Sequence, residues 1–147
     1  MTREEMNDYL ESIGGLENGM YSNKPKITSC DFFDVQVGWY PLIKNLIDEL
    51  ITLGWDKKVT QVKEKFGTLR VYHTCADEEE IYDAVKAAES LSALVCEETG
   101  VFNETVGSSS KGWIKTLAKD QAGFNSGWHS RYDDDLLAIL EEIKLNK

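Results

Sequence analysis

The stretch QVKEKFGTLRVYHT, residues 61–74, decides the fold that this chain is expected to adopt. Strand-forming residues occupy both of its halves, and Lys65-Phe66-Gly67 lies between them with a glycine that can adopt a turn conformation. The pattern predicts a β-hairpin centred on residues 58–74. The hairpin also concentrates basic residues, with Glu64 as its single acid, although the whole chain has a formal net charge of −10.

Helical periodicity flanks the hairpin on both sides. Residues 41–53 carry a broad apolar stripe, and Pro41 stands in the first helical turn, where no backbone N–H is required. Residues 77–97 predict a second long helix, which opens with acids that the helix dipole favours and ends before Gly100.

Two further helices complete the predicted set. One follows the Thr2–Glu5 capping box near the start of the chain, and the other covers residues 133–145. The sequence therefore predicts an α+β fold, in which a small antiparallel sheet with the hairpin at about 58–74 packs against three to four helices. A chain of 147 residues is expected to form a single domain, residues 1–147.

The overall composition limits the cellular compartment and the kinds of partner that we expect for this protein. There are three cysteines, which predict reduced thiols rather than a disulfide framework. No apolar run approaches the roughly 20 residues that span a bilayer, and the acidic N-terminal segment lacks the apolar core of a signal peptide. We therefore expect a cytoplasmic protein without membrane contact. The acidity also argues against binding of long nucleic acids, which requires clustered lysine and arginine.

Side chains alternate across a strand, so the hairpin residues sort into two faces. If Val62 faces the core, then Lys63, Lys65, Arg70 and Tyr72 share the opposite face. Such a face suits an anion, and an aromatic ring beside it suits a base or a sugar. Trp113 is a further candidate for stacking on a base. The alternative interpretation is the ordinary solvated face of a half-buried sheet.

The chain offers no recognisable catalytic or cofactor motif. There is no nucleophile elbow, no Walker-type loop and no dinucleotide-binding glycine pattern. Asp133, Asp134 and Asp135 are best explained as acids that open a helix. We therefore expect a protein that is not an enzyme and that holds no cofactor and no metal.

Four motifs resemble a family of small uncharacterised proteins of tailed phages and prophages. They are GWYPLIKNLIDEL, QVKEKFGTLRVY, AAESLSALVCEETG and GWIKTLAKDQA, which together cover residues 38–122. The family pattern is GWxxL, VKEKFGxLRxY, CExCG and GW(I/L)xTLCxxH, and the KEKFGxLR element is its most specific part.

The resemblance implies a small zinc site with four ligands, formed by a C-x-x-C and a C-x-x-H pair. This sequence departs from that pattern, because Cys96 is followed by Thr99, Ala118 and Gln121 at the other three positions. One thiolate cannot hold a structural zinc. The chain therefore resembles a degenerate member in which ordinary packing replaces the metal.

The resemblance also implies a phage context, in which small accessory proteins counter host antiviral defence. We expect a protein that binds and sequesters a small anionic signal of the nucleotide type. The alternative is an acidic inhibitor that binds a host defence protein directly, as a DNA mimic does. If the gene belongs to a phage, the site of action is the host cytoplasm. Two or more exposed tryptophans would favour a homo-oligomer.

Overall fold

A computed structural model describes residues 1–20, 25–75, 77–109, 113–122, 127–132 and 136–138, and it confirms the predicted α+β class. Its helices are α1 (Arg3–Ser12), α2 (Tyr40–Thr52) and α3 (Glu79–Ser92), with the 3-10 helices η1 (Cys30–Phe32) and η2 (Val37–Trp39). Residues 136–138 are also helical, and the rest of the helix expected at 133–145 lies outside the described residues.

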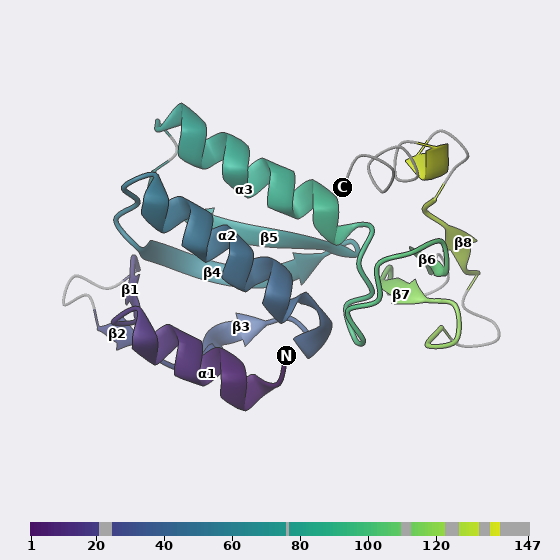
Figure 1. The fold of residues 1–147 in the computed structure, drawn as a ribbon, viewed down its shortest axis with the longest axis horizontal. Helices are drawn as coiled ribbons and strands as arrows, with labels where there is room; N and C mark the ends of the chain where they lie inside the picture. Colours follow the sequence, from purple (N-terminus) through teal and green to yellow (C-terminus); the bar gives the residue numbers. More distant parts are fainter. Residues whose placement is uncertain (21–24, 76, 110–112, 123–126, 133–135, 139–147) are drawn as a thin grey trace.

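The described strands form two sheets (Figure 1). The larger sheet contains β1 (Leu16–Asn18), β2 (Lys26–Ile27), β3 (Phe33–Asp34), β4 (Lys58–Lys65) and β5 (Thr68–His73). The smaller, antiparallel sheet contains β6 (Val106–Ser108), β7 (Thr116–Ala118) and β8 (His129–Ser130).

The predicted hairpin is formed by β4 and β5, which pair antiparallel. Lys65 pairs with Thr68, so the connection is the two-residue loop Phe66-Gly67. Both loop residues have positive φ, 53° at Phe66 and 82° at Gly67. This is the type I′ geometry, whose twist matches that of the flanking strands. Glycine adopts it without strain, whereas phenylalanine rarely does.

The sheet around the hairpin is larger than expected and mixed rather than antiparallel. β1 and β3 both pair parallel with β4 on the edge that β5 leaves free, β1 at Lys58 and Val59, and β3 at Val62 and Lys63. Over residues 16–37 the sequence predicts mostly loop, with one short strand around residues 26–29. Strands of two or three residues are too short to display an alternating pattern.

Helices α1, α2 and α3 lie beside one another and cover one face of the larger sheet (Figure 1). Their apolar stripes meet the inward side chains of the hairpin in one buried cluster. Its main members are Met6, Leu10, Trp39, Ile43, Leu46, Ile47, Leu50, Val59, Val62, Leu69, Val71, Ile81 and Val85. Burial of these side chains is the main stabilising contribution to the fold.

The outer edge of β5 is sealed by side chains of α3. The backbone N–H of Leu69 donates to Ser92 Oγ at 2.8 Å, and the N–H of Val71 donates to Glu89 Oε2 at 3.0 Å. Both α3 side chains are buried. These two outward backbone donors are therefore satisfied within the chain, although β5 has no neighbouring strand on this side among the described residues.

Helix α3 ends at Ser92, five residues before the predicted end. The N–H groups of residues 93–95 bond to carbonyls three residues back, and from Cys96 onward the backbone pairs with other segments. Glu97 N–H donates to the Thr116 carbonyl at 3.0 Å, and the Glu97 carbonyl accepts from Gly38 N–H at 2.7 Å. Gly100 N–H donates to the Cys96 carbonyl at 2.9 Å, which closes a tight turn. These contacts connect α3 to η2 and to β7.

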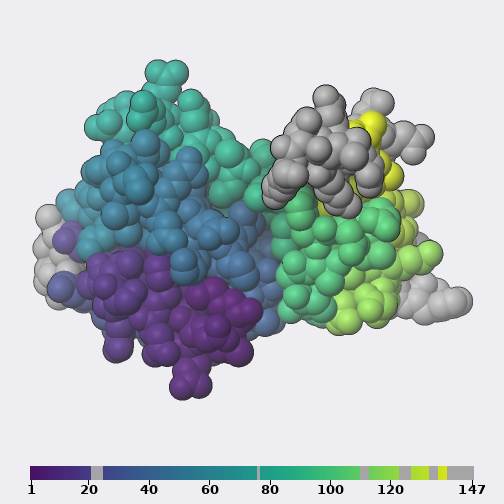
Figure 2. All heavy atoms as spheres, in the orientation of Figure 1, coloured from purple at the N-terminus to yellow at the C-terminus, as the bar shows by residue number. Residues whose placement is uncertain are grey.

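A second apolar cluster supports the smaller sheet, and it contains Cys96, Val106, Leu117, Ala118 and Tyr132. In Figure 2 the described part of this region, coloured green to yellow, forms a block beside the helices. The single domain expected over residues 1–147 stays a prediction. Within the described residues, no helix is both long and apolar enough to cross a bilayer.

Candidate ligand-binding site at the hairpin tip

The basic residues of the hairpin share one face, as the alternation of the strands predicts. Lys63 and Arg70 are directly opposite each other in the β4–β5 pairing, and Lys65 lies two residues further along the same face. Tyr72 belongs to this face as well, and the Lys63 ammonium lies 5.7 Å from the centre of its ring. Their neighbours Val62 and Val71 are buried on the other side.

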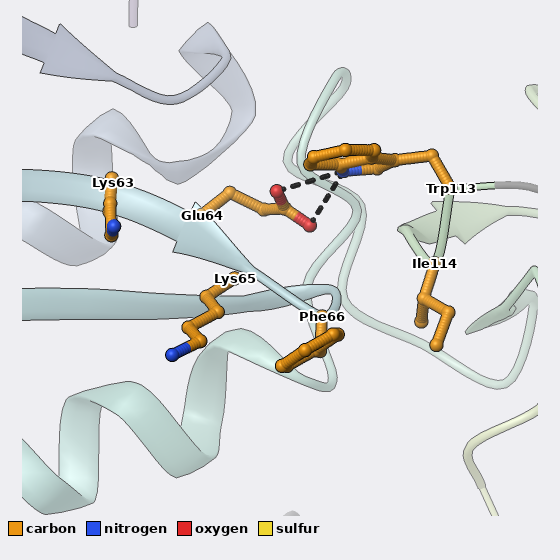
Figure 3. Close-up of a pocket in the computed structure, with 6 residues that line it drawn as sticks. All are labelled: Lys63, Glu64, Lys65, Phe66, Trp113 and Ile114. Atoms are coloured by element: carbon orange, nitrogen blue, oxygen red, sulfur yellow. Dashed lines mark hydrogen bonds between the residues drawn. The ribbon is translucent and has the colours of Figure 1, made fainter.

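A pocket of about 370 Å³ lies at the tip of the hairpin (Figure 3). Its lining residues come from the end of β4, from the turn and from the segment before β7; they are Lys63, Glu64, Lys65, Phe66, Trp113 and Ile114. Two aromatic side chains dominate its exposed surface, since Phe66 is 66% exposed and Trp113 is 69% exposed. Such exposure of large aromatic rings is typical of binding surfaces.

Glu64 holds the pocket together by joining the turn to the segment before β7. Its carboxylate accepts from the N–H of Gly67 at 2.7 Å and from Trp113 Nε1 at 3.0 Å (Figure 3). A second link is made by Thr116, whose buried hydroxyl donates to the Gly67 carbonyl at 2.5 Å. The two aromatic walls are therefore fixed to each other through one carboxylate and one hydroxyl.

The Lys65 ammonium completes the basic rim of the pocket. It lies 5.7 Å from the centre of the Phe66 ring. Lys63 and Lys65 extend on the side of the pocket away from Ile114 (Figure 3). The pocket thus combines apolar rings with two cationic groups, an arrangement suited to a flat ligand that carries negative charge.

The structure separates Tyr72 from Trp113, which sequence reasoning had treated as alternative stacking partners for one ligand. Arg70 and Tyr72 line a different depression of about 180 Å³, between β5 and α3. The aromatic residue that shares the tip pocket with Trp113 is Phe66. Of the five predicted residues, Lys63, Lys65 and Trp113 line the tip pocket, whereas Arg70 and Tyr72 do not. Arg70 lies opposite Lys63 in the strand pairing and lines the depression beside α3.

Three residues of the pocket were not singled out from the sequence: Glu64, Phe66 and Ile114. For Phe66 a signal did exist, because type I′ turns favour Asn, Asp or Gly at that position and an exposed phenylalanine there is costly. The carboxylate of Glu64 gave no comparable signal, since its partners come from the turn and from a segment distant in the sequence.

The four positions at which the resemblance implies zinc ligands do not fit a metal. Cys96 and Ala118 are buried in the second apolar cluster, while Thr99 and Gln121 are exposed. Among the described residues, no group of three or more His, Cys, Asp or Glu side chains converges on one point. Apolar packing around Cys96 fills this region, and the absence of zinc stays a prediction.

Among the four tryptophans, all of which lie in described segments, only Trp113 is exposed. Trp39 and Trp55 are buried, and Trp128 is half-buried. A homo-oligomer was expected only if two or more tryptophans were exposed, and this condition is not met.

No protein-family model matches this sequence, and neither a curated protein nor a solved structure matches it significantly. The resemblance to phage proteins stays a prediction from the motifs quoted above.

Proposed function

We propose that the hairpin tip binds a small anionic ligand with a planar ring system, of the nucleotide class, and that the protein sequesters this ligand without converting it. The observation that carries the proposal is the tip pocket itself. It is lined by two exposed aromatic residues, Phe66 and Trp113, together with Lys63 and Lys65, and the Lys65 ammonium group lies 5.7 Å from the centre of the Phe66 ring.

In this binding mode the ring system of the ligand stacks on Trp113 and Phe66. Stacking of a base on an aromatic side chain contributes about 1–3 kcal/mol. The phosphate lies over Lys63 and Lys65 and reaches Arg70, whose planar guanidinium can make two parallel hydrogen bonds to it. The acidic remainder of the surface disfavours long nucleic acids, while a short ligand still reaches a local positive site.

The proposed biological role follows from the resemblance to phage proteins. A protein that sequesters a nucleotide signal would blunt a host antiviral defence that depends on this signal. The role needs no catalytic group, so a stoichiometric amount of protein should be required for the effect. Turnover of a bound nucleotide by the pure protein would contradict this part of the proposal.

The second candidate is direct inhibition of a host defence protein through the acidic surface. It is favoured by the exposed run Glu78, Glu79 and Glu80 at the start of α3. The acidic first helix, α1, is a second segment that would contribute to this surface, and a third, Asp133 to Asp135, lies outside the described residues. In this mode the partner is a basic protein, and binding weakens steeply with salt.

The deciding experiment is a thermal-shift and calorimetric screen against mononucleotides, cyclic dinucleotides and cyclic ADP-ribose isomers. The variants are Trp113→Ala and Arg70→Ala, and Lys26→Ala on β2 is the control because this lysine is exposed and remote from the tip. A ligand that stabilises the wild type should bind about ten- to a hundred-fold more weakly to either site variant. The control should bind as the wild type does.

Two outcomes would overturn the proposal. Either no nucleotide shifts the melting temperature, or both site variants bind as tightly as the wild type. The second candidate then becomes the better explanation, and it predicts recovery of one salt-sensitive protein partner from host lysate by wild type and by Arg70→Ala alike.

A further inference from the structure

A second pocket, with a volume of about 260 Å³, shares Glu64 and Trp113 with the tip pocket. Its lining is polar and mostly acidic, with three carboxylates against one ammonium group. The charged members are Asp34, Glu64, Glu97 and Lys115. The pocket is therefore complementary in charge to a cation, the reverse of the neighbouring tip pocket.

Glu97 is the deepest charged group of this pocket, and only 2% of the residue is exposed. Its Oε2 accepts from the backbone N–H of Gln36 at 3.1 Å. Its buried Oε1 has no hydrogen-bond donor among the described residues. The ammonium group of Lys115 stays 3.7 Å from Oε1, which is an ion pair but lies beyond hydrogen-bond distance.

A buried carboxylate oxygen without a donor is costly, by about 1–3 kcal/mol or more for a charged group. Burial also raises the pKa of Glu97. The backbone around Glu97 is fixed on both sides, since its N–H bonds Thr116 and its carbonyl accepts from Gly38. The backbone of Glu97 is therefore held in position, and one carboxylate oxygen is anchored by the N–H of Gln36 while the other stays buried without a donor among the described residues.

We propose that this pocket binds a single alkylguanidinium or alkylammonium group, which donates a hydrogen bond to Glu97 Oε1. Asp34 and Glu64 supply further negative charge at its rim, and the exposed indole of Trp113 provides an aromatic wall against which an organic cation is stabilised. Lys115 competes with the ligand for the Glu97 carboxylate, because its ammonium group lies 3.7 Å from the same oxygen, Oε1.

A metal cation fits this pocket less well than an organic one. Divalent metals require several oxygen ligands at about 2.0–2.6 Å, and no such group of side chains converges within the described residues. A guanidinium or ammonium group needs only one or two acceptors and benefits from the indole. The proposal stands on the acidic pocket alone and does not depend on the proposed function of the hairpin tip.

The test is a titration of the full chain with ethylguanidinium and with ethylammonium, in the absence of any nucleotide. The reporter is the indole N–H resonance of Trp113, which is identified by its loss in Trp113→Phe. This proton is hydrogen-bonded to Glu64 and lies at the pocket wall, so it should shift when a cation enters. Circular dichroism checks that each variant keeps the fold.

Three variants make the test specific. Glu97→Gln keeps the shape of the side chain and removes its charge, so it should bind the cations at least about tenfold more weakly. Lys115→Met removes the competing ammonium group and should bind them more tightly. Glu98→Gln, at the exposed neighbouring position, should bind as the wild type does. A purely structural role of Glu97 predicts no such opposite effects of Glu97→Gln and Lys115→Met.

A capped arginine dipeptide forms the second arm and distinguishes the source of the cation. Saturable binding of the free cations alone identifies a small-molecule ligand, and binding of the dipeptide alone identifies an arginine side chain of a protein partner. Either result supports the proposal if the binding is lost in Glu97→Gln. The absence of a saturable shift for every probe, or equal binding by wild type and Glu97→Gln, overturns it.

Discussion

Replacement of Ser92 by alanine should weaken the junction between α3 and β5 by an amount that the structure allows us to estimate. The hydroxyl of Ser92 is fully buried, accepts from the Leu69 N–H at 2.8 Å and donates to the Glu89 carbonyl at 2.5 Å. Alanine leaves the buried N–H of Leu69 without an acceptor, which costs about 1–3 kcal/mol. Against this, alanine is the better helix former by about 0.5 kcal/mol. The expected net loss is therefore about 0.5–2.5 kcal/mol in the free energy of unfolding.

Ser90 offers a matched control on the same helix, because it is exposed and gives no hydrogen bond to β5. Ser90→Ala should stabilise the protein by about 0.5 kcal/mol, so the two variants should differ by about 1–3 kcal/mol. Urea unfolding followed by far-UV circular dichroism measures this difference, and amide hydrogen exchange should show faster exchange at Leu69 in Ser92→Ala alone. If the two variants unfold at the same urea concentration, the hydroxyl does not stabilise the strand edge and the reasoning is wrong.

Three further predictions concern stability. Gly38→Ala should cost about 3 kcal/mol in urea unfolding, because a Cβ there would overlap the carbonyl groups of Cys96 and Glu97, and a loss below about 1 kcal/mol would contradict this packing. Phe66→Asn should raise the free energy of unfolding by about 1 kcal/mol, since Asn tolerates the positive φ at this position. The same variant should lose nucleotide binding, and unchanged binding in calorimetry would contradict the proposed role of the tip pocket. Burial raises the pKa of Glu97 above its ordinary value of 4.5, so the folded state holds its proton more tightly than the unfolded state does. The wild type should accordingly lose stability relative to Glu97→Gln as pH rises from 4.5 through the raised pKa, and parallel urea midpoints of the two proteins across pH would refute this.

The hairpin could be predicted from the sequence because its determinants are local. Alternation assigns the faces of both strands. The connection was predicted at Lys65-Phe66-Gly67, and the actual two-residue turn Phe66-Gly67 fixes the register that sets Lys63 against Arg70. Helix α2 was predictable for the same reason, since Pro41 and the apolar stripe lie within the element itself.

The parts that could not be predicted depend on contacts between distant segments. Strands β1 and β3 are too short to have a pattern and exist because β4 offers them a free edge. The segment that follows α3 is held by hydrogen bonds of Glu97 to Gly38 and Thr116, which no local signal announces. In the site, the charges of the basic face follow from local spacing, whereas the position of Trp113 follows from its bond to Glu64.

The sealed edge of β5 also limits the ways in which a partner can engage this protein. Many proteins recognise an extended peptide by adding it as a further strand to an open sheet edge, which requires free backbone donors and acceptors. Here the outward N–H groups of Leu69 and Val71 are already occupied by Ser92 and Glu89, so an incoming strand would have to displace two buried side chains. Strand addition is therefore disfavoured at the outer edge of β5, and the ligand site proposed at the tip depends on side chains rather than on backbone groups.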